Sequence, residues 1–85
     1  MKYYFSKQVE YSFEEALERT IKILDASGFV LINTIDLREK IKNALDKDIP
    51  RYTIVQACNP NLASRIINIE PRVGVLLPCN GLVRE

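Results

Sequence analysis

Two cysteines, each next to proline and asparagine, are the residues of this chain best suited to chemistry. Cys58 stands directly before Asn59-Pro60, where a predicted strand passes into a predicted helix. Unpaired N–H groups and the positive end of a helix dipole favour a thiolate or a bound anion at such a junction. Cys79 follows Pro78 at the end of another predicted strand. These five residues form the candidate ligand-binding site, and no residue is assigned as catalytic.

The two cysteine segments meet only if the strands that precede them run in the same direction. A helix over 60–70 is long enough to connect strand 51–57 to strand 73–77 as a parallel crossover. Parallel strands would place both cysteines at one edge of the sheet, where open α/β sheets commonly bind ligands. Antiparallel or separated strands would move the cysteines apart and weaken this interpretation.

Structural roles are the plainer alternative for the same residues. A lone cysteine in a small domain is more often a buried small hydrophobe than a nucleophile, and Asn59 with Pro60 suits a helix cap. The chain has two cysteines and no histidine, so a zinc site would be incomplete and no metal is expected. The cysteine spacing also lacks the Cys-x-x-Cys form of thioredoxin-like redox sites. The three glycines are scattered, so no phosphate loop and no cofactor are expected.

Length and composition narrow the classes of function. The 85 residues make one small α/β domain spanning 1–85, with 47% hydrophobic and 27% charged residues. A net charge of +1 argues against binding of nucleic acid or of a membrane through bulk electrostatics. The absence of histidine excludes Ser-His-Asp and Cys-His mechanisms as normally built. No apolar run reaches ~18 residues and no secretory leader is recognised, so a cytoplasmic protein with reduced thiols is expected.

The elements that must position the cysteines alternate between strand and helix. Capping signals at Ser12, Asp36 and Asn59 mark three helix starts, Gly28 ends the first helix and Pro71 ends the third. The first and third helices carry apolar stripes that we expect to face inward: Phe13, Ala16, Leu17, Ile21 and Leu24, then Leu62, Ala63, Ile66 and Ile67.

Apolar patterning predicts the strands between these helices. The predicted strands cover 3–9, 29–35, 51–57 and 73–77, and residues 78–81 read as a turn. The order is β-α-β-α-β-α-β. It predicts an α+β fold, a two-layer sandwich with helices packed on a four- to five-stranded sheet.

Several of these segments follow one another as in a known family. Tyr52-Thr53-Ile54, Cys58-Asn59-Pro60 and Leu76-Leu77-Pro78-Cys79-Asn80 resemble the domain-of-unknown-function family numbered 302, and the resemblance extends from about Val9 to Val83. It implies a two-layer sandwich of the type seen in the TATA-box-binding protein and association as dimers. It implies no biochemical activity, and fold similarity alone gives no ground for DNA binding. It marks the same five candidate residues and assigns them no role.

The chain departs from that pattern at its end. Many members of the family continue past the Pro-Cys-Asn segment, whereas this sequence stops at Glu85. We expect either a naturally short member or a truncated form. A missing part would leave a sheet edge or face uncovered, and an exposed edge invites pairing with another chain.

Three hypotheses for function come from different classes. We favour a small cytosolic binding or assembly module without enzymatic activity, which forms a homodimer and binds a small anionic ligand, if any, near Cys58 and Asn59. The alternative is a thiol-dependent enzyme or redox sensor with Cys58 as nucleophile and Cys79 as its resolving partner. Binding of nucleic acid by the sheet would need a basic face, which the balanced charge does not favour.

Overall fold

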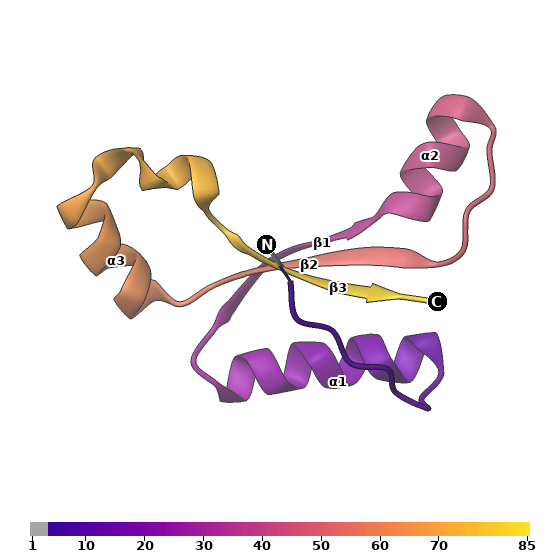
Figure 1. The fold of residues 1–85 in the computed structure, drawn as a ribbon, viewed down its shortest axis with the longest axis horizontal. Helices are drawn as coiled ribbons and strands as arrows, with labels where there is room; N and C mark the ends of the chain where they lie inside the picture. Colours follow the sequence, from indigo (N-terminus) through magenta and orange to yellow (C-terminus); the bar gives the residue numbers. More distant parts are fainter. Residues whose placement is uncertain (1–3) are drawn as a thin grey trace.

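The structure, a computed structural model, describes residues 4–85 as a small antiparallel sheet with one helix against it (Figure 1). The helix α1 lies along one face of the sheet, whereas α2 and α3 extend beyond its opposite ends. The strands are in the order β1-β2-β3, and both pairs are antiparallel. The elements are α1 (Phe13–Ala26), β1 (Val30–Asp36), α2 (Leu37–Leu45), β2 (Tyr52–Cys58), α3 (Pro60–Ile69), the 3-10 helix η1 (Pro71–Leu76) and β3 (Cys79–Arg84).

Two predicted strands are not formed in the part of the chain that the structure describes. Residues 4–9 lack regular secondary structure, and Tyr3 of that prediction lies outside the described residues. Residues 73–76 belong to η1, because Pro71 starts a helical turn and a short apolar run fits helix or strand equally well.

The predicted turn at 78–81 was also wrong, since β3 begins at Cys79. Residues 4–85 therefore form a three-stranded sheet and not the predicted four or five strands. The α+β class holds, but the element order begins with a helix and closes on η1 and β3.

The helix starts follow the capping residues that the sequence predicts. Ser12 Oγ accepts the N–H of Glu15 at 3.2 Å, and Asp36 Oδ1 accepts the N–H of Glu39 at 3.1 Å. Each bond satisfies an N–H group that has no partner inside its helix. The starts of α1 and α2 are thus fixed by side chains within four residues of sequence.

Gly28 ends α1 as predicted, by adopting a left-handed conformation with φ +87°. The N–H of Phe29 reaches the Leu24 carbonyl at 3.0 Å, and the N–H of Gly28 reaches the Asp25 carbonyl at 3.2 Å. These two bonds form a Schellman motif, which turns the chain from α1 into β1.

The core lies between α1 and the middle strand. Thr53, Val55 and Ala57 alternate along β2 and are 6%, 0% and 2% exposed. The helix α1 contacts all three strands, and the predicted inward stripe on it is half-buried along its length. One face of the sheet is thus covered by α1.

The prediction of an inward stripe on α3 was wrong. Leu62, Ile66 and Ile67 are 49%, 40% and 43% exposed, and Ala63 is half-buried. The reason is position, since α3 projects beyond the end of the sheet and packs mainly against η1 (Figure 1).

Arg51 joins the start of α1 to the sheet. Its guanidinium pairs with Glu14 and lies 5.4 Å from the ring centre of Phe13. The backbone N–H of Arg51 donates to Glu85 Oε1 at 2.8 Å, and the backbone N–H of Glu85 donates to the Arg51 carbonyl at 3.0 Å. The start of α1, the start of β2 and the end of β3 therefore lie together.

The outer strand β1 carries a β-bulge. Leu31 pairs with Ala57 and Asn33 with Gln56, so Ile32 is an extra residue in β1. Ile32 is 56% exposed. A bulge bends an edge strand and interrupts its regular hydrogen-bonding pattern.

Replacing Gly28 tests the left-handed end of α1. We expect Gly28→Ala to lower the free energy of unfolding by about 1 kcal/mol, because a Cβ is strained at positive φ. Urea denaturation followed by circular dichroism measures the change. Gly74→Ala is the matched control, since Gly74 has no positive φ and a Cβ there meets no described atom within 4 Å. Equal losses in the two variants would contradict this explanation.

Candidate functional site

The two cysteines lie at the same end of the sheet. Cys58 is the last residue of β2 and pairs with Val30 of β1, and its side chain is half-buried. Cys79 is the first residue of β3 and pairs with Ala57, the residue before Cys58. Its side chain is exposed, and both cysteines are free thiols.

The reason for this proximity differs from the predicted one. The prediction joined two parallel strands through a crossover helix, with both cysteines at strand ends. The strands are antiparallel, so β3 begins where β2 ends, and the chain returns through α3 and η1. The shared end of the sheet is therefore found, whereas the predicted parallel pairing and the strand end at Cys79 were wrong.

The thiols belong to opposite faces of the sheet. Cys79 is paired with Ala57, so its side chain shares the face that α1 covers. Cys58 is one residue further along β2, and side chains alternate between faces along a strand. Cysteines whose Cβ atoms point apart cannot form a disulfide without movement of the backbone.

The start of α3 is already capped by its own chain. Asn59 Oδ1 accepts the N–H of Leu62 at 3.2 Å, and Pro60 occupies the first helical turn. Asn59 thus satisfies one of the N–H groups that an anion would otherwise meet. Pro78, the remaining candidate residue, is half-buried and follows Leu77 through a cis peptide bond.

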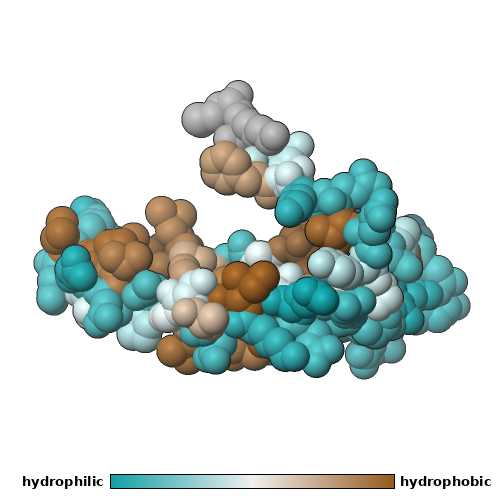
Figure 2. Space-filling model, turned by 90° about the horizontal axis from the view of Figure 1, so that it is seen from below, coloured by the Kyte–Doolittle hydropathy of each residue, from teal (hydrophilic) through white to brown (hydrophobic). Residues whose placement is uncertain are grey.

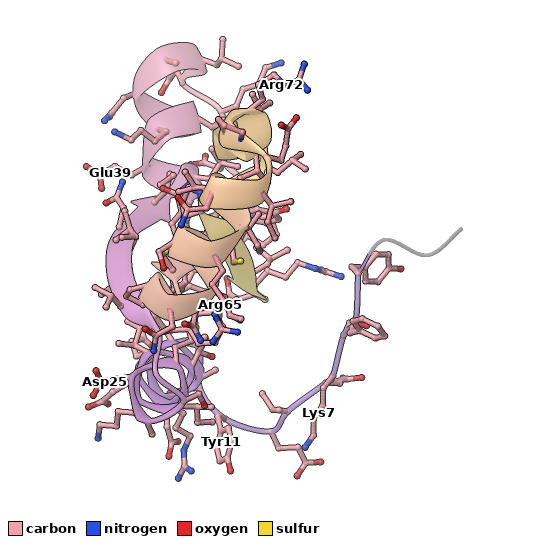
Figure 3. All side chains as sticks on the ribbon, turned by 90° about the vertical axis from the view of Figure 1, so that its left-hand side faces the viewer. Lys7, Tyr11, Asp25, Glu39, Arg65 and Arg72 are labelled. Atoms are coloured by element: carbon pink, nitrogen blue, oxygen red, sulfur yellow. The ribbon has the colours of Figure 1, made fainter. Side chains whose placement is uncertain are left out.

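The charged residues near these segments do not converge on the thiols. Arg72 Nε donates to Glu70 Oε1 at 2.8 Å. Figure 3 shows Arg65 and Arg72 near opposite ends of the stretch formed by α3 and η1. Among residues 4–85, no group of three or more cysteine, histidine or acidic side chains is placed to hold a metal ion.

A charged hollow that sequence reasoning missed lies at the other end of the sheet. It has a volume of about 280 Å³ and is lined by Phe13, Glu14, Asp36, Arg38, Arg51, Tyr52 and Thr53. No spacing rule identifies it, because its residues come from α1, β1, α2, β2 and the residue before β2, and they meet only in the folded chain. The pairing of Arg51 with Glu14 gives this hollow a structural role.

Comparison with known proteins identifies the family. The family model of the domain of unknown function DUF302 matches residues 5–85. The chain belongs to the DUF302 family. The resemblance noted in the sequence is thereby confirmed, and it covers nearly the whole chain.

A solved structure of the DUF302 family shares the fold. The crystal structure of an uncharacterized conserved DUF302 protein from Bacillus stearothermophilus superposes with a TM-score of 0.84 and is 28% identical in sequence. The similarity covers 91% of this chain and 60% of that chain. This chain thus spans 60% of the length of that protein.

Two searches gave negative results. A search of curated proteins finds no match to this DUF302 chain. Within residues 4–85, no helix has the length and apolar character needed to cross a membrane.

The opposed thiols lead to an expectation for oxidation. Treatment with oxidised glutathione should leave Cys58 and Cys79 unlinked to each other, because their side chains leave the sheet on opposite faces. Intact mass after alkylation measures this as two modified or glutathionylated thiols per chain. A mass lower by two hydrogens, with a peptide linking both cysteines, would show the opposite.

The cap of α3 leads to a second expectation. Asn59→Ala should lower the free energy of unfolding by about 1 kcal/mol, because the N–H of Leu62 loses its acceptor. Asn59→Asp keeps an acceptor oxygen and should retain most of the stability in the same urea titration. Equal stability of the wild type and Asn59→Ala would mean that the cap contributes nothing.

Proposed function

We propose that this DUF302 chain is a non-enzymatic assembly module that acts as a homodimer. The supporting observation is an excess of exposed surface. The chain exposes 7166 Å², whereas a compact monomer of 9.8 kDa exposes about 5,200 Å². The excess of about 2,000 Å² per chain lies within the range that obligate homodimers bury, roughly 1,000–2,500 Å² per partner.

The shape of the chain supports the same proposal. The radius of gyration is 14.8 Å, whereas a compact domain of this length has about 12 Å. Large apolar side chains are left exposed along the molecule, and Figure 2 shows them gathered in several patches on one side. The most exposed are Phe5 at 103%, Val75 at 88%, Ile69 at 84% and Leu76 at 78%. A partner surface would remove such side chains from water.

The predicted small-ligand site remains a separate proposal. Cys58, Asn59, Pro60, Pro78 and Cys79 gather at one end of the sheet, but Asn59 caps α3 and the two thiols face opposite ways. This geometry does not support the alternative, a thiol-dependent enzyme or redox sensor, because Cys58 and Cys79 lie on opposite faces of the sheet. Assembly is therefore the function that the geometry favours, and a cytoplasmic location remains a prediction.

A larger sheet also follows from this proposal. The TATA-box-binding-protein-like fold that the family resemblance implies needs more strands than the three of residues 4–85. A strand contributed by a second chain would bring the sheet to the predicted size of four or five.

Sedimentation equilibrium tests the homodimer. Across roughly 1–100 µM, where moderate dissociation constants fall, we expect a mass about twice the chain mass of 9.8 kDa. The dimer should persist at raised salt, because apolar burial is not screened. A single-chain mass throughout this range would overturn the proposal.

A further inference from the structure

The outer side of α3 carries an apolar stripe that exposes much of its surface. Leu62, Ile66 and Ile69 follow one another at spacings of four and three residues, so they lie on one side of the helix. They are 49%, 40% and 84% exposed. Ala63 is the only half-buried residue of α3, and the helix packs mainly against η1. The stripe therefore faces away from the contacts that α3 makes with its own chain.

The neighbouring 3-10 helix enlarges this apolar surface. Figure 2 shows apolar residues gathered at the left end of the molecule, where α3 and η1 lie. Six side chains of these two helices together expose roughly 600–700 Å², close to the ~800 Å² that each partner of a standard interface buries. The six are Leu62, Ile66, Ile67, Ile69, Val75 and Leu76.

The stripe lies at the end of the molecule that is far from Glu85. The helix α3 leaves the sheet after Cys58, at the end where β3 begins. The six residues of β3 then run about 17 Å to the opposite end, where Glu85 bonds to Arg51. Any residues that follow Glu85 in a longer chain would have to cross the length of the sheet to reach the stripe.

Two opposite charges border the stripe, one on each side of it. Arg65 precedes Ile66, is exposed, and has no acidic partner among residues 4–85 (Figure 3). Glu70 follows Ile69 on the other side. Its Oε1 accepts from Arg72 at 2.8 Å, and 44% of its side chain is exposed. In heptad terms Leu62 and Ile69 are d positions, Ile66 is an a position, and the two charges occupy g and the following e.

We propose that α3 pairs in parallel with α3 of a second copy. The inference rests on the proposed homodimer and specifies one of its contacts. A two-fold axis sets each residue of the stripe against its own counterpart, in three apolar layers. Arg65 of each copy then reaches Glu70 of the other, because g and e positions meet across a parallel pair of helices. Both charge pairs form at once.

The same charges select the direction of the pairing. Arg65 lies near the middle of the stripe, between Leu62 and Ile69. In an antiparallel pair each flank meets the same flank of the other copy, so the two Arg65 side chains would face each other. Like charges across an interface oppose association. The parallel pair replaces this repulsion with two attractive contacts.

The helix is short but is already formed within the single chain. Its ten residues make about three turns, fewer than an isolated peptide needs to be helical in water. Here the Asn59 side chain caps its start and η1 packs against it. A second copy therefore meets a preformed helix, and its contacts need not supply the free energy of folding α3.

Disulfide trapping tests the pairing directly. In a Cys58→Ala and Cys79→Ser background, Leu62→Cys should link two copies under mild oxidation, because the parallel pair sets residue 62 against its counterpart. Covalent dimers on a non-reducing gel measure the link. Ser64→Cys is the matched control, since Ser64 is exposed and lies on the side of α3 away from the stripe.

Two outcomes of this trapping would overturn the parallel pair. The first is an equal yield of covalent dimer from Leu62→Cys and Ser64→Cys, a zero yield from both included. The second is a mixture in which Leu62→Cys links only to Ile69→Cys, as it would in an antiparallel pair.

Reversal of charge tests the two salt bridges. Arg65→Glu and Glu70→Lys should each raise the dimer dissociation constant about tenfold, because two attractive pairs become repulsive. An equimolar mixture of these variants should regain the wild-type affinity, since both pairs are attractive in the mixed dimer. Sedimentation equilibrium measures each case, and raised salt should reduce the differences. Lys40→Glu is the control for net charge, because Lys40 is exposed on α2, at the other end of the sheet (Figure 1).

These measurements separate failure of the α3 pairing from failure of the homodimer. A mixture no tighter than its components would contradict the exchanged charge pairs. A dimer that Arg65→Glu leaves unchanged and that Leu62→Cys does not link would keep the homodimer and overturn the α3 pairing. A wild-type chain that stays monomeric would overturn both.

Discussion

The structure depends on the packing of one helix against one face of its middle strand. Thr53, Val55 and Ala57 are the residues of β2 that α1 covers, and they are the most deeply buried side chains of the described chain. The register of both outer strands is set against β2, so the core face and the sheet are specified together. The Arg51 contacts hold α1 in place at one end, and the Gly28 turn holds it at the other. The remaining helices add little cover, because they lie beyond the sheet.

That same register governs the chemistry of the cysteine segments. Antiparallel pairing of β2 with β3 brings Cys58 and Cys79 to one end of the sheet, and the alternation of side chains sends them to opposite faces. Proximity along the backbone therefore does not become proximity of the sulfur atoms. The Asn59 side chain is used in starting α3. These local contacts favour structural roles for the Cys-Asn-Pro segment over a shared reactive centre.

The sequence was informative where structure is decided by near neighbours. The caps at Ser12, Asp36 and Asn59 and the turn at Gly28 act within five residues, and all four are confirmed. The predicted parallel pairing of strands 51–57 and 73–77 was wrong, because strand pairing depends on contacts between distant segments, which no local pattern encodes. The run at 73–77 was misassigned for a related reason, since a short apolar segment becomes a strand only when a sheet edge receives it. The candidate site was located at one end of the sheet, but the faces of its thiols needed the register.

The bulge at Ile32 bears on how far a sheet of this kind can grow. The two outer strands of the sheet differ in regularity. The pairing of β3 with β2 is continuous, whereas the pairing of β1 with β2 is interrupted by an extra residue. A sheet with two regular edge strands can add a further chain at each edge, and repeated addition builds a fibril. An extra residue in an edge strand interrupts the regular row of N–H and C=O groups that such pairing needs. The bulge therefore makes β1 a poor template for the addition of a further strand, and so guards that side of the sheet against fibril growth.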